Sequence, residues 1–166
     1  MEYAEINMPV FKPVRIPTRQ LNWFQRALKS FKRRNWELVE DYVLYIPWLN
    51  ETFLIPKGFV FDGASVPRAF WLLVDPTGIL LIGSMFHDFG YRYTCFLNDK
   101  FEIVHADVKR EFVDDLIKDI SEYVNGWHLM NDAAWAALRV FGWVGWYKDR
   151  RDNRNVLLEY GDRIKG

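Results

Sequence analysis

An apolar run that ends in a histidine and an aspartate constrains the fold of this chain more than any other feature. Eight mostly apolar residues, Ile79 to Phe86, lead directly into His87 to Arg92, which read HDFGYR. A buried helix accounts for the run, but an aspartate in that setting is costly unless it is paired or bound to a metal. On a helix, His87 and Tyr91 share a face and Asp88 lies about 100° around, so the three side chains can address one cavity.

Two runs rich in Val, Ile, Tyr, Phe and Trp precede this region and predict a β-hairpin. They cover Trp36 to Ile46 and Thr52 to Phe61, and Pro47 and Asn50 lie between them. The sequence Pro56-Lys57-Gly58 interrupts the second run, so that strand should bend there or lie at the edge of a sheet.

The chain after residue 65 has a helical pattern. Between about Ala106 and Val124, apolar residues recur every four positions and mark one buried stripe, namely Val108, Phe112, Leu116, Ile120 and Val124. A Trp-rich stretch from Asn131 to Tyr147 predicts a further helix. We therefore expect an α+β fold in which an N-terminal β-hairpin or small antiparallel sheet packs on a bundle of about three helices. Residues 1–166 form one domain in this interpretation, with the hairpin at 36–61 and a catalytic-like helical core at 62–150.

Charge and length exclude several classes of protein. The 166 residues carry 22 Lys and Arg against 22 Asp and Glu, which argues against a specific nucleic-acid binder. Zero net charge favours association, so a homo-oligomer is one expectation. The single cysteine, Cys95, excludes an internal disulfide. The start of the chain has no secretory pattern, and the apolar stretch from Ala133 to Trp146 is too short to span a bilayer, which indicates synthesis in the cytoplasm without a transmembrane segment.

The first 35 residues are basic although the whole chain is neutral. They contain two acidic residues, Glu2 and Glu5, against eight basic ones, namely Lys12, Arg15, Arg19, Arg26, Lys29, Lys32, Arg33 and Arg34. Apolar residues from Leu21 to Phe31 predict a short amphipathic helix that follows Thr18 as its N-cap. Its basic face is either simply solvated or in contact with an anionic surface or an acidic partner.

Two further groups of residues offer chemistry. The turn Asp62-Gly63, which follows an apolar strand, is either a cap or a source of metal ligands, and Ser65 is a natural N-cap before Pro67. Asp107, with Arg110 close by, lies near the start of the next helix, where antiparallel packing brings it toward His87. A zinc site that joins His87 to His105 or His128 is a weaker alternative because no metal-binding spacing supports it. A Ser65–His87–Asp107 triad is weaker as well, because Ser65 is better explained as a cap.

Three motifs resemble those of a phage and bacterial family classed as a domain of unknown function. They are GFVFDGASVPRAFW from Gly58 to Trp71, which includes Arg68, then HDFGYR from His87 to Arg92, and then Ala106-Asp107 with Arg110. The resemblance covers roughly Trp36 to Trp146. It implies a phage origin and supplies no activity.

The HDFGYR sequence is also similar to the catalytic helix of bacterial secreted phospholipase A2 enzymes. That resemblance implies that His87 is the general base, that Asp107 orients it, and that Tyr91 buttresses the pair. It further implies a calcium ion held by Asp88 together with Asp62 and the carbonyls of its turn at Gly63, because calcium prefers oxygen ligands. Ser65, Arg68, Arg92 and Arg110 are supporting residues in this interpretation. The chain lacks the cysteines of those enzymes.

Three functions remain open from the sequence. The first is a metal-assisted ester hydrolase of phospholipase A2 type, associated with a phage and acting on lipid. The second is a non-catalytic tail, baseplate or assembly protein that binds other virion subunits, made in the host cytoplasm and incorporated in the virion. The third is cleavage of peptidoglycan or another part of the cell envelope by the same site. A solvent-reachable cavity around His87 favours an enzyme, whereas carboxylates sealed by arginines favour a scaffold.

Overall fold

The computed structural model describes residues 6–15, 22–23, 35–61, 80–149 and 160. Three helices and seven short strands are assigned within these ranges. The helices are α2 (Leu81–Tyr93), α3 (Arg110–Asn125) and α4 (Leu129–Asp149). The strands are β1 (Phe11–Pro13), β2 (Trp36–Leu38), β3 (Tyr42–Ile46), β4 (Glu51–Ile55), β5 (Val60–Phe61), β6 (Phe96–Leu97) and β7 (Ile103–His105). The predicted helix between residues 21 and 31 lies outside the described ranges except for residues 22–23.

The predicted hairpin is present, and it is divided between two antiparallel sheets. Strands β3 and β4 pair from Tyr42–Ile55 to Ile46–Glu51, and the turn at residues 47–50 joins them. The same two runs continue past a bend and pair again as β2 and β5. The bend lies where the Pro56-Lys57-Gly58 interruption predicts it, with Gly58 at a φ of 84° that only glycine adopts readily. Asp41 stabilises the bend because its carboxylate accepts a hydrogen bond of 2.6 Å from the backbone N–H of Lys57.

The two sheets contain strands that the sequence pattern does not reveal. One sheet has the order β1-β2-β5 and the other the order β3-β4-β6-β7. Strands β1, β6 and β7 are only two or three residues long, too short for an alternating pattern to identify. The α+β class and the packing of an antiparallel sheet on three helices are nevertheless as predicted.

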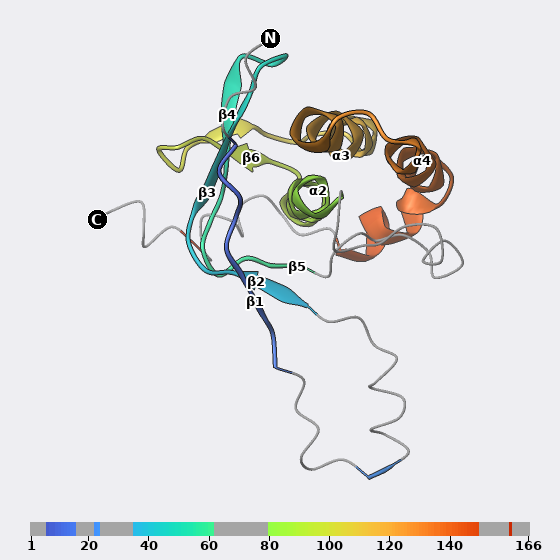
Figure 1. The fold of residues 1–166 in the computed structure, drawn as a ribbon, viewed down its shortest axis with the longest axis horizontal. Coiled ribbons are helices and arrows are strands. Elements are labelled where there is room, and N and C mark those ends of the chain that lie inside the picture. Colours follow the sequence, from blue (N-terminus) through green and yellow to red (C-terminus); the bar gives the residue numbers. More distant parts are fainter. Residues whose placement is uncertain (1–5, 16–21, 24–34, 62–79, 150–159, 161–166) are drawn as a thin grey trace.

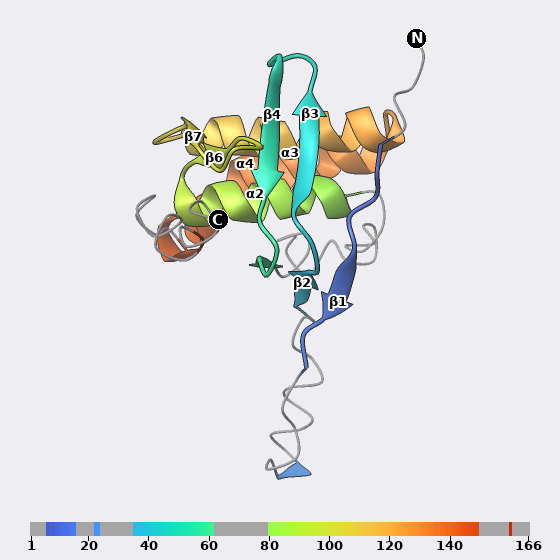
Figure 2. The same ribbon diagram turned by 90° about the vertical axis from the view of Figure 1, so that its left-hand side faces the viewer.

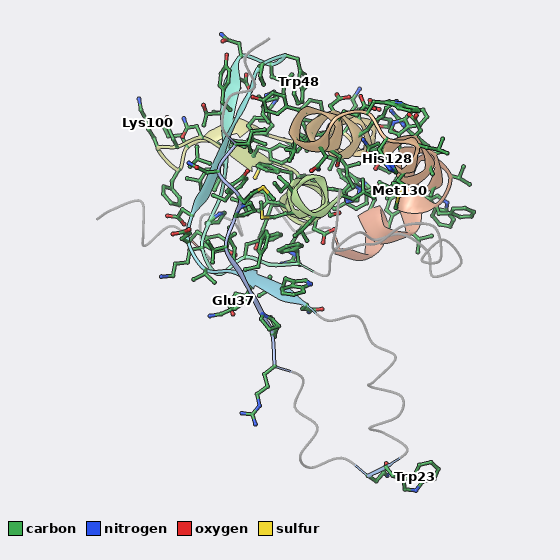
Figure 3. All side chains as sticks on the ribbon, in the orientation of Figure 1. Trp23, Glu37, Trp48, Lys100, His128 and Met130 are labelled. Atoms are coloured by element: carbon green, nitrogen blue, oxygen red, sulfur yellow. The ribbon has the colours of Figure 1, made fainter. Side chains whose placement is uncertain are left out.

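The larger sheet lies against one side of the helices. Figure 1 shows α2 and α3 viewed nearly end-on beside β3, β4 and β6, and Figure 2 shows the strands crossing in front of the helices. Trp48, at the tip of the hairpin, packs edge-on against Tyr123 of α3 at 5.7 Å between ring centroids (Figure 3). Aromatic side chains make up a large part of the core, and its fully buried rings are those of Phe53, Phe59, Phe61, Phe86, Phe89, Tyr93 and Phe96.

The three helices pack in an antiparallel series. A glycine early in α2, Gly83, faces Ile117 and Ser121 of α3, and a later one, Gly90, faces Val113, so the two helices run in opposite directions. Helix α4 returns along α3 and is joined to it by polar contacts. Asp115 accepts hydrogen bonds from the indole of Trp135 at 2.8 Å and from Arg139 at 2.5 Å, and Lys118 pairs with Asp132 at 2.6 Å.

Two further properties bear on the sequence-based expectations. In the described part of the chain, no helix is both long enough and apolar enough to cross a membrane. Cys95, which lies just before β6, is fully buried, and burial together with the nearby charge of Asp107 raises the pKa of its thiol to about 12. The predicted N-cap at Ser65 lies outside the described residues.

The close approach of α2 and α3 predicts different outcomes for two glycine-to-alanine variants. A Cβ at Gly83 would lie 2.6 Å from the backbone carbonyl oxygen of Ile117, which cannot move without separating the helices. Gly83→Ala should lower the free energy of unfolding by about 1–3 kcal/mol. In Gly145→Ala the new Cβ would lie 3.6 Å from the ring of Tyr91, an ordinary contact, so this variant should match or slightly exceed the wild type. Chemical denaturation measures both, and equal losses would contradict the packing.

Candidate functional site

His87 lies on the side of α2 that faces α3. Its side chain is only 1% exposed, and the two preceding residues, Met85 and Phe86, are also buried. An imidazole in this position needs polar partners, because an unpaired buried polar group costs free energy. The identity of those partners determines what the site can do.

A carboxylate faces each nitrogen of the His87 ring. Nε2 lies 3.4 Å from Oδ1 of Asp114 in α3, and Nδ1 lies 3.6 Å from Oδ1 of Asp88, the next residue in α2. Asp114 is completely buried, whereas the side chain of Asp88 is 10% exposed. The imidazole is therefore held between an inner carboxylate and an outer one, and the outer side is the more open to solvent.

Tyr91 completes the contacts of Asp114 on the α2 side. Its hydroxyl donates a hydrogen bond of 2.5 Å to Oδ1, the same oxygen that faces His87. One turn of helix separates Tyr91 from His87, and the centroids of their rings are 4.0 Å apart. Asp114 thus holds both side chains at a fixed distance from α3.

Arg110 supplies the positive charge that balances the buried Asp114. Its Nη1 lies 3.4 Å from Oδ2 of Asp114, one turn further along α3, and donates to the backbone carbonyls of Leu138 and Arg139 in α4 at 3.2 and 3.3 Å. Among the described residues, Oδ2 accepts no hydrogen bond, so its contact with Arg110 is an ion pair only. One guanidinium therefore joins α3 to α4 at the level of the site.

Helix α4 closes the site on the side of Tyr91. Gly142 allows this approach, since a Cβ there would lie 2.5 Å from the Tyr91 hydroxyl oxygen and 3.7 Å from Oδ1 of Asp114. One turn later, the buried Trp146 packs edge-on against the Tyr91 ring, with centroids 5.1 Å apart. All three helices therefore contribute to the environment of His87.

The two carboxylates determine the protonation of the ring. Burial lowers the pKa of His87, but the hydrogen bonds and negative charges of Asp114 and Asp88 outweigh it, so the pKa is raised above its ordinary value of 6.5. Burial raises the pKa of Tyr91 strongly, and the hydrogen bond to Asp114 and the charge of that carboxylate add to the effect. The Tyr91 hydroxyl consequently keeps its proton and remains a donor.

The structure brings together four of the residues predicted from sequence, namely His87, Asp88, Tyr91 and Arg110. The aspartate at Nε2 of His87 is Asp114, which sequence reasoning missed, whereas Asp107 was expected there. Asp107 precedes α3 with a left-handed φ of 52°, is exposed, and lines an open pocket with Arg110. Asp114 carries its own signal, an acidic residue between Val113 and Leu116 on the apolar face of a helix, one turn after an arginine.

The remaining predicted residues are distributed differently. The guanidinium of Arg92 lies over the ring of Phe59, 4.9 Å from its centroid, outside the cluster around Asp114. Asp62, Gly63, Ser65 and Arg68 lie outside the described residues, so the predicted turn, its capping role and the triad with Ser65 remain predictions.

Neither alternative histidine lies in the cluster around His87. His105 of the edge strand β7 contacts Glu51 of the inner strand β4 at 2.5 Å, and His128 accepts a hydrogen bond from the N–H of Met130 at the start of α4. Within the described ranges, no three or more His, Cys, Asp or Glu side chains gather in a way that could hold a metal ion. Of the three residues predicted to bind calcium, the structure describes Asp88. The other two, Asp62 and Gly63, are not among the described residues.

Comparison with known proteins gives one match. Residues 36–138, well over half of the chain, match the family described as "Protein of unknown function (DUF1353)". This range begins at β2 and extends into α4, so it includes the sheets, His87, Asp88, Tyr91, Arg110 and Asp114. No curated protein and no solved structure gives a match.

The raised pKa of His87 predicts how stability depends on pH. Because the folded protein binds this proton more tightly than the unfolded chain, the stabilisation is complete below about pH 6.5 and is lost as pH rises through the folded pKa. In His87→Gln, that part of the pH dependence should disappear. Unfolding free energies between pH 5 and 9 measure it, with the exposed His128→Gln as control. Parallel profiles for His87→Gln and wild type would contradict the assignment.

The contact between Gly142 and Tyr91 predicts a coupling that two variants can test. Gly142→Ala should displace the Tyr91 hydroxyl from Asp114, and Tyr91→Phe removes that donor, so each should lower the free energy of unfolding by about 1–3 kcal/mol. In the double variant the new methyl group no longer meets a hydroxyl, so the total loss should be smaller than the sum of the two. Strictly additive losses, measured by denaturation, would mean that Gly142 does not position Tyr91.

Proposed function

The chain belongs to the DUF1353 family, and we propose that it is a metal-assisted ester hydrolase in which His87 is the general base. The observation that carries this proposal is the shared oxygen of Asp114, which faces Nε2 of His87 and accepts the hydroxyl of Tyr91. A general base must have a fixed orientation as well as a free lone pair. Asp114 supplies the orientation at Nε2, and the nitrogen proposed to react is Nδ1, which faces the more exposed carboxylate of Asp88.

The reacting nitrogen in this proposal is Nδ1. It lies on the side of Asp88, the more exposed of the two carboxylates, so water and an ester would approach from there. The neutral imidazole takes a proton from water at Nδ1 as the water oxygen adds to the ester carbonyl. The imidazolium that forms is stabilised by Asp114 at Nε2, and it returns the proton to the leaving alcohol.

The charges around the cluster support this proton transfer. Arg110 forms an ion pair with Oδ2 of Asp114 and the Tyr91 hydroxyl donates to Oδ1, so both oxygens of the carboxylate that faces the imidazolium have partners. The same negative surroundings raise the pKa of His87 above 6.5, so a higher pH is needed before the neutral, active base prevails. Activity should accordingly rise with pH above about 6.5 and level off beyond the His87 pKa.

Calcium is the cation we propose for the outer side of the ring. Asp88 would hold it, together with Asp62 and a turn carbonyl at Gly63, as the resemblance to phospholipase A2 implies. A hard cation with oxygen ligands supplies polarisation of an ester carbonyl and stabilisation of the oxyanion. A lipid ester is the substrate class we propose, and a phage the source, with synthesis in the host cytoplasm.

Release of fatty acid from mixed phospholipid micelles tests the proposal. We expect hydrolysis in calcium that is abolished by a chelator, and losses of about 10²–10⁴-fold in His87→Gln and Asp114→Asn. Asp88→Asn should lose both activity and the thermal stabilisation by calcium, since it removes a proposed ligand. His128→Gln is the matched control and should retain full activity. Folded wild type that releases no fatty acid in calcium, with or without added lipid surface, would overturn the proposal.

A binding role in a virion is the second candidate, and the outer face of α4 favours it. Five large apolar residues there are about half exposed or more, namely Val140, Phe141, Trp143, Val144 and Tyr147. An exposed cluster of this kind is typical of a surface that contacts another molecule. In this alternative the cluster around Asp114 serves only to join the three helices, and His87→Gln would leave particle assembly intact.

A further inference from the structure

An open pocket of about 440 Å³ lies between the start of α3 and the last turns of α4. This volume is within the range of small-molecule sites, about 300–1,000 Å³. Three aromatic residues of α4 line one side of the pocket, Trp143, Trp146 and Tyr147, which lie three and four positions apart and therefore share a face of the helix. The pocket belongs to neither the proposed base nor the proposed metal ligands, because His87 and Asp88 do not line it.

The aromatic side of the pocket is both exposed and anchored. Trp143 is 56% exposed and Tyr147 75% exposed, although large rings are normally covered in a core. Trp146 is buried and held edge-on against Tyr91, so it gives the pocket a fixed floor. A set of rings open to solvent on one side and fixed on the other is suited to a ligand that binds to ring surfaces.

The opposite side of the pocket carries two carboxylates, Asp107 and Glu111. Arg110 also lines it, but its guanidinium is directed to the carbonyls of Leu138 and Arg139 and to Asp114 and Glu111. The remaining cation is Lys109, the N-cap position of α3, where no side chain caps the helix. The pocket therefore combines aromatic rings and acidic groups with one cationic position at its rim.

We propose that this pocket binds a quaternary ammonium group of the kind found in choline. Aromatic rings attract such cations through the negative faces of their π systems, and nearby carboxylates add a favourable charge without a directional requirement. A methylated ammonium has no N–H groups, which suits the side of the pocket formed by the three rings. Lys109 lies where it can contact a phosphate attached to the ligand, so phosphocholine fits the pocket better than choline alone.

Quenching of tryptophan fluorescence by choline tests the site, with 3,3-dimethylbutanol as its uncharged isostere. We expect saturable binding of choline and no binding of the isostere. Trp143→Ala and Tyr147→Ala should each weaken binding roughly 3- to 30-fold, while Trp127→Ala, an exposed tryptophan outside the pocket, should not. Lys109→Ala should weaken binding of phosphocholine but not of choline. Calorimetry repeats the measurement in the Trp143→Ala protein, where the fluorescence signal is reduced.

Two further measurements identify the source of the ligand and show that choline binding does not depend on the proposed hydrolysis. Free phosphocholine that binds while phosphatidylcholine vesicles do not would identify a soluble or polymer-bound ligand, and vesicle binding that Trp143→Ala abolishes would identify a lipid headgroup. His87→Gln should bind choline like the wild type, so loss of hydrolysis leaves this result unaffected. Equal binding of choline and its isostere, no binding of either, or full affinity in Trp143→Ala would overturn the proposal.

Discussion

The burial of one carboxylate, that of Asp114, determines how the helical half of this protein is assembled. An aspartate with no exposed surface is tolerated only if its charge is compensated, and the compensating side chains come from α2 and α3, with α4 bound to one of them. His87 and Tyr91 of α2 face Oδ1, Arg110 of α3 faces Oδ2, and the same guanidinium binds two carbonyls of α4. Removal of any one partner would leave a buried charge incompletely paired, which is why such networks impose a single arrangement of the elements around them.

The packing of the helices provides the close distances that this network requires. Glycines occur where α2 meets α3, at Gly83 and Gly90, and where α4 meets Tyr91, at Gly142. At each of these positions a side chain would overlap atoms of the neighbouring helix. On the side of α2 toward the larger sheet, Phe86 packs against Phe53 of β4 and Phe89 against Phe96 of β6, so His87 cannot relax away from α3. The polar cluster around Asp114 and the apolar core therefore pack against opposite sides of α2.

Much of the fold follows from local patterns, and the site follows from them only in part. The hairpin, its bend at Gly58 and the three helices each have a periodicity or a turn residue that identifies them. The pairing of His87 with Asp114 depends on how α3 is rotated about its axis, and a stripe of Val and Leu defines that rotation only within one or two positions. Asp107 and Asp114 are seven residues apart, so a helix that began near Ala106 would place both on one side. Helix α3 begins only at Arg110, and Asp107 precedes it with a φ of 52°, so the helical spacing does not apply to Asp107 and Asp114 is the aspartate that faces His87. Strands β6 and β7 exist because β4 offers an edge for pairing, and no local signal predicts that.

Cys95 has a consequence of a different kind. It is the only cysteine in the chain, it has no exposed surface, and its thiol titrates only near pH 12. Reagents that modify sulfur attack the thiolate, so the native protein should be nearly inert to them at neutral pH. Modification requires the core around Cys95 to open locally, and its rate at different concentrations of reagent therefore reports how often this part of the core opens. The protein thus carries an internal probe of its own opening, without any introduced label.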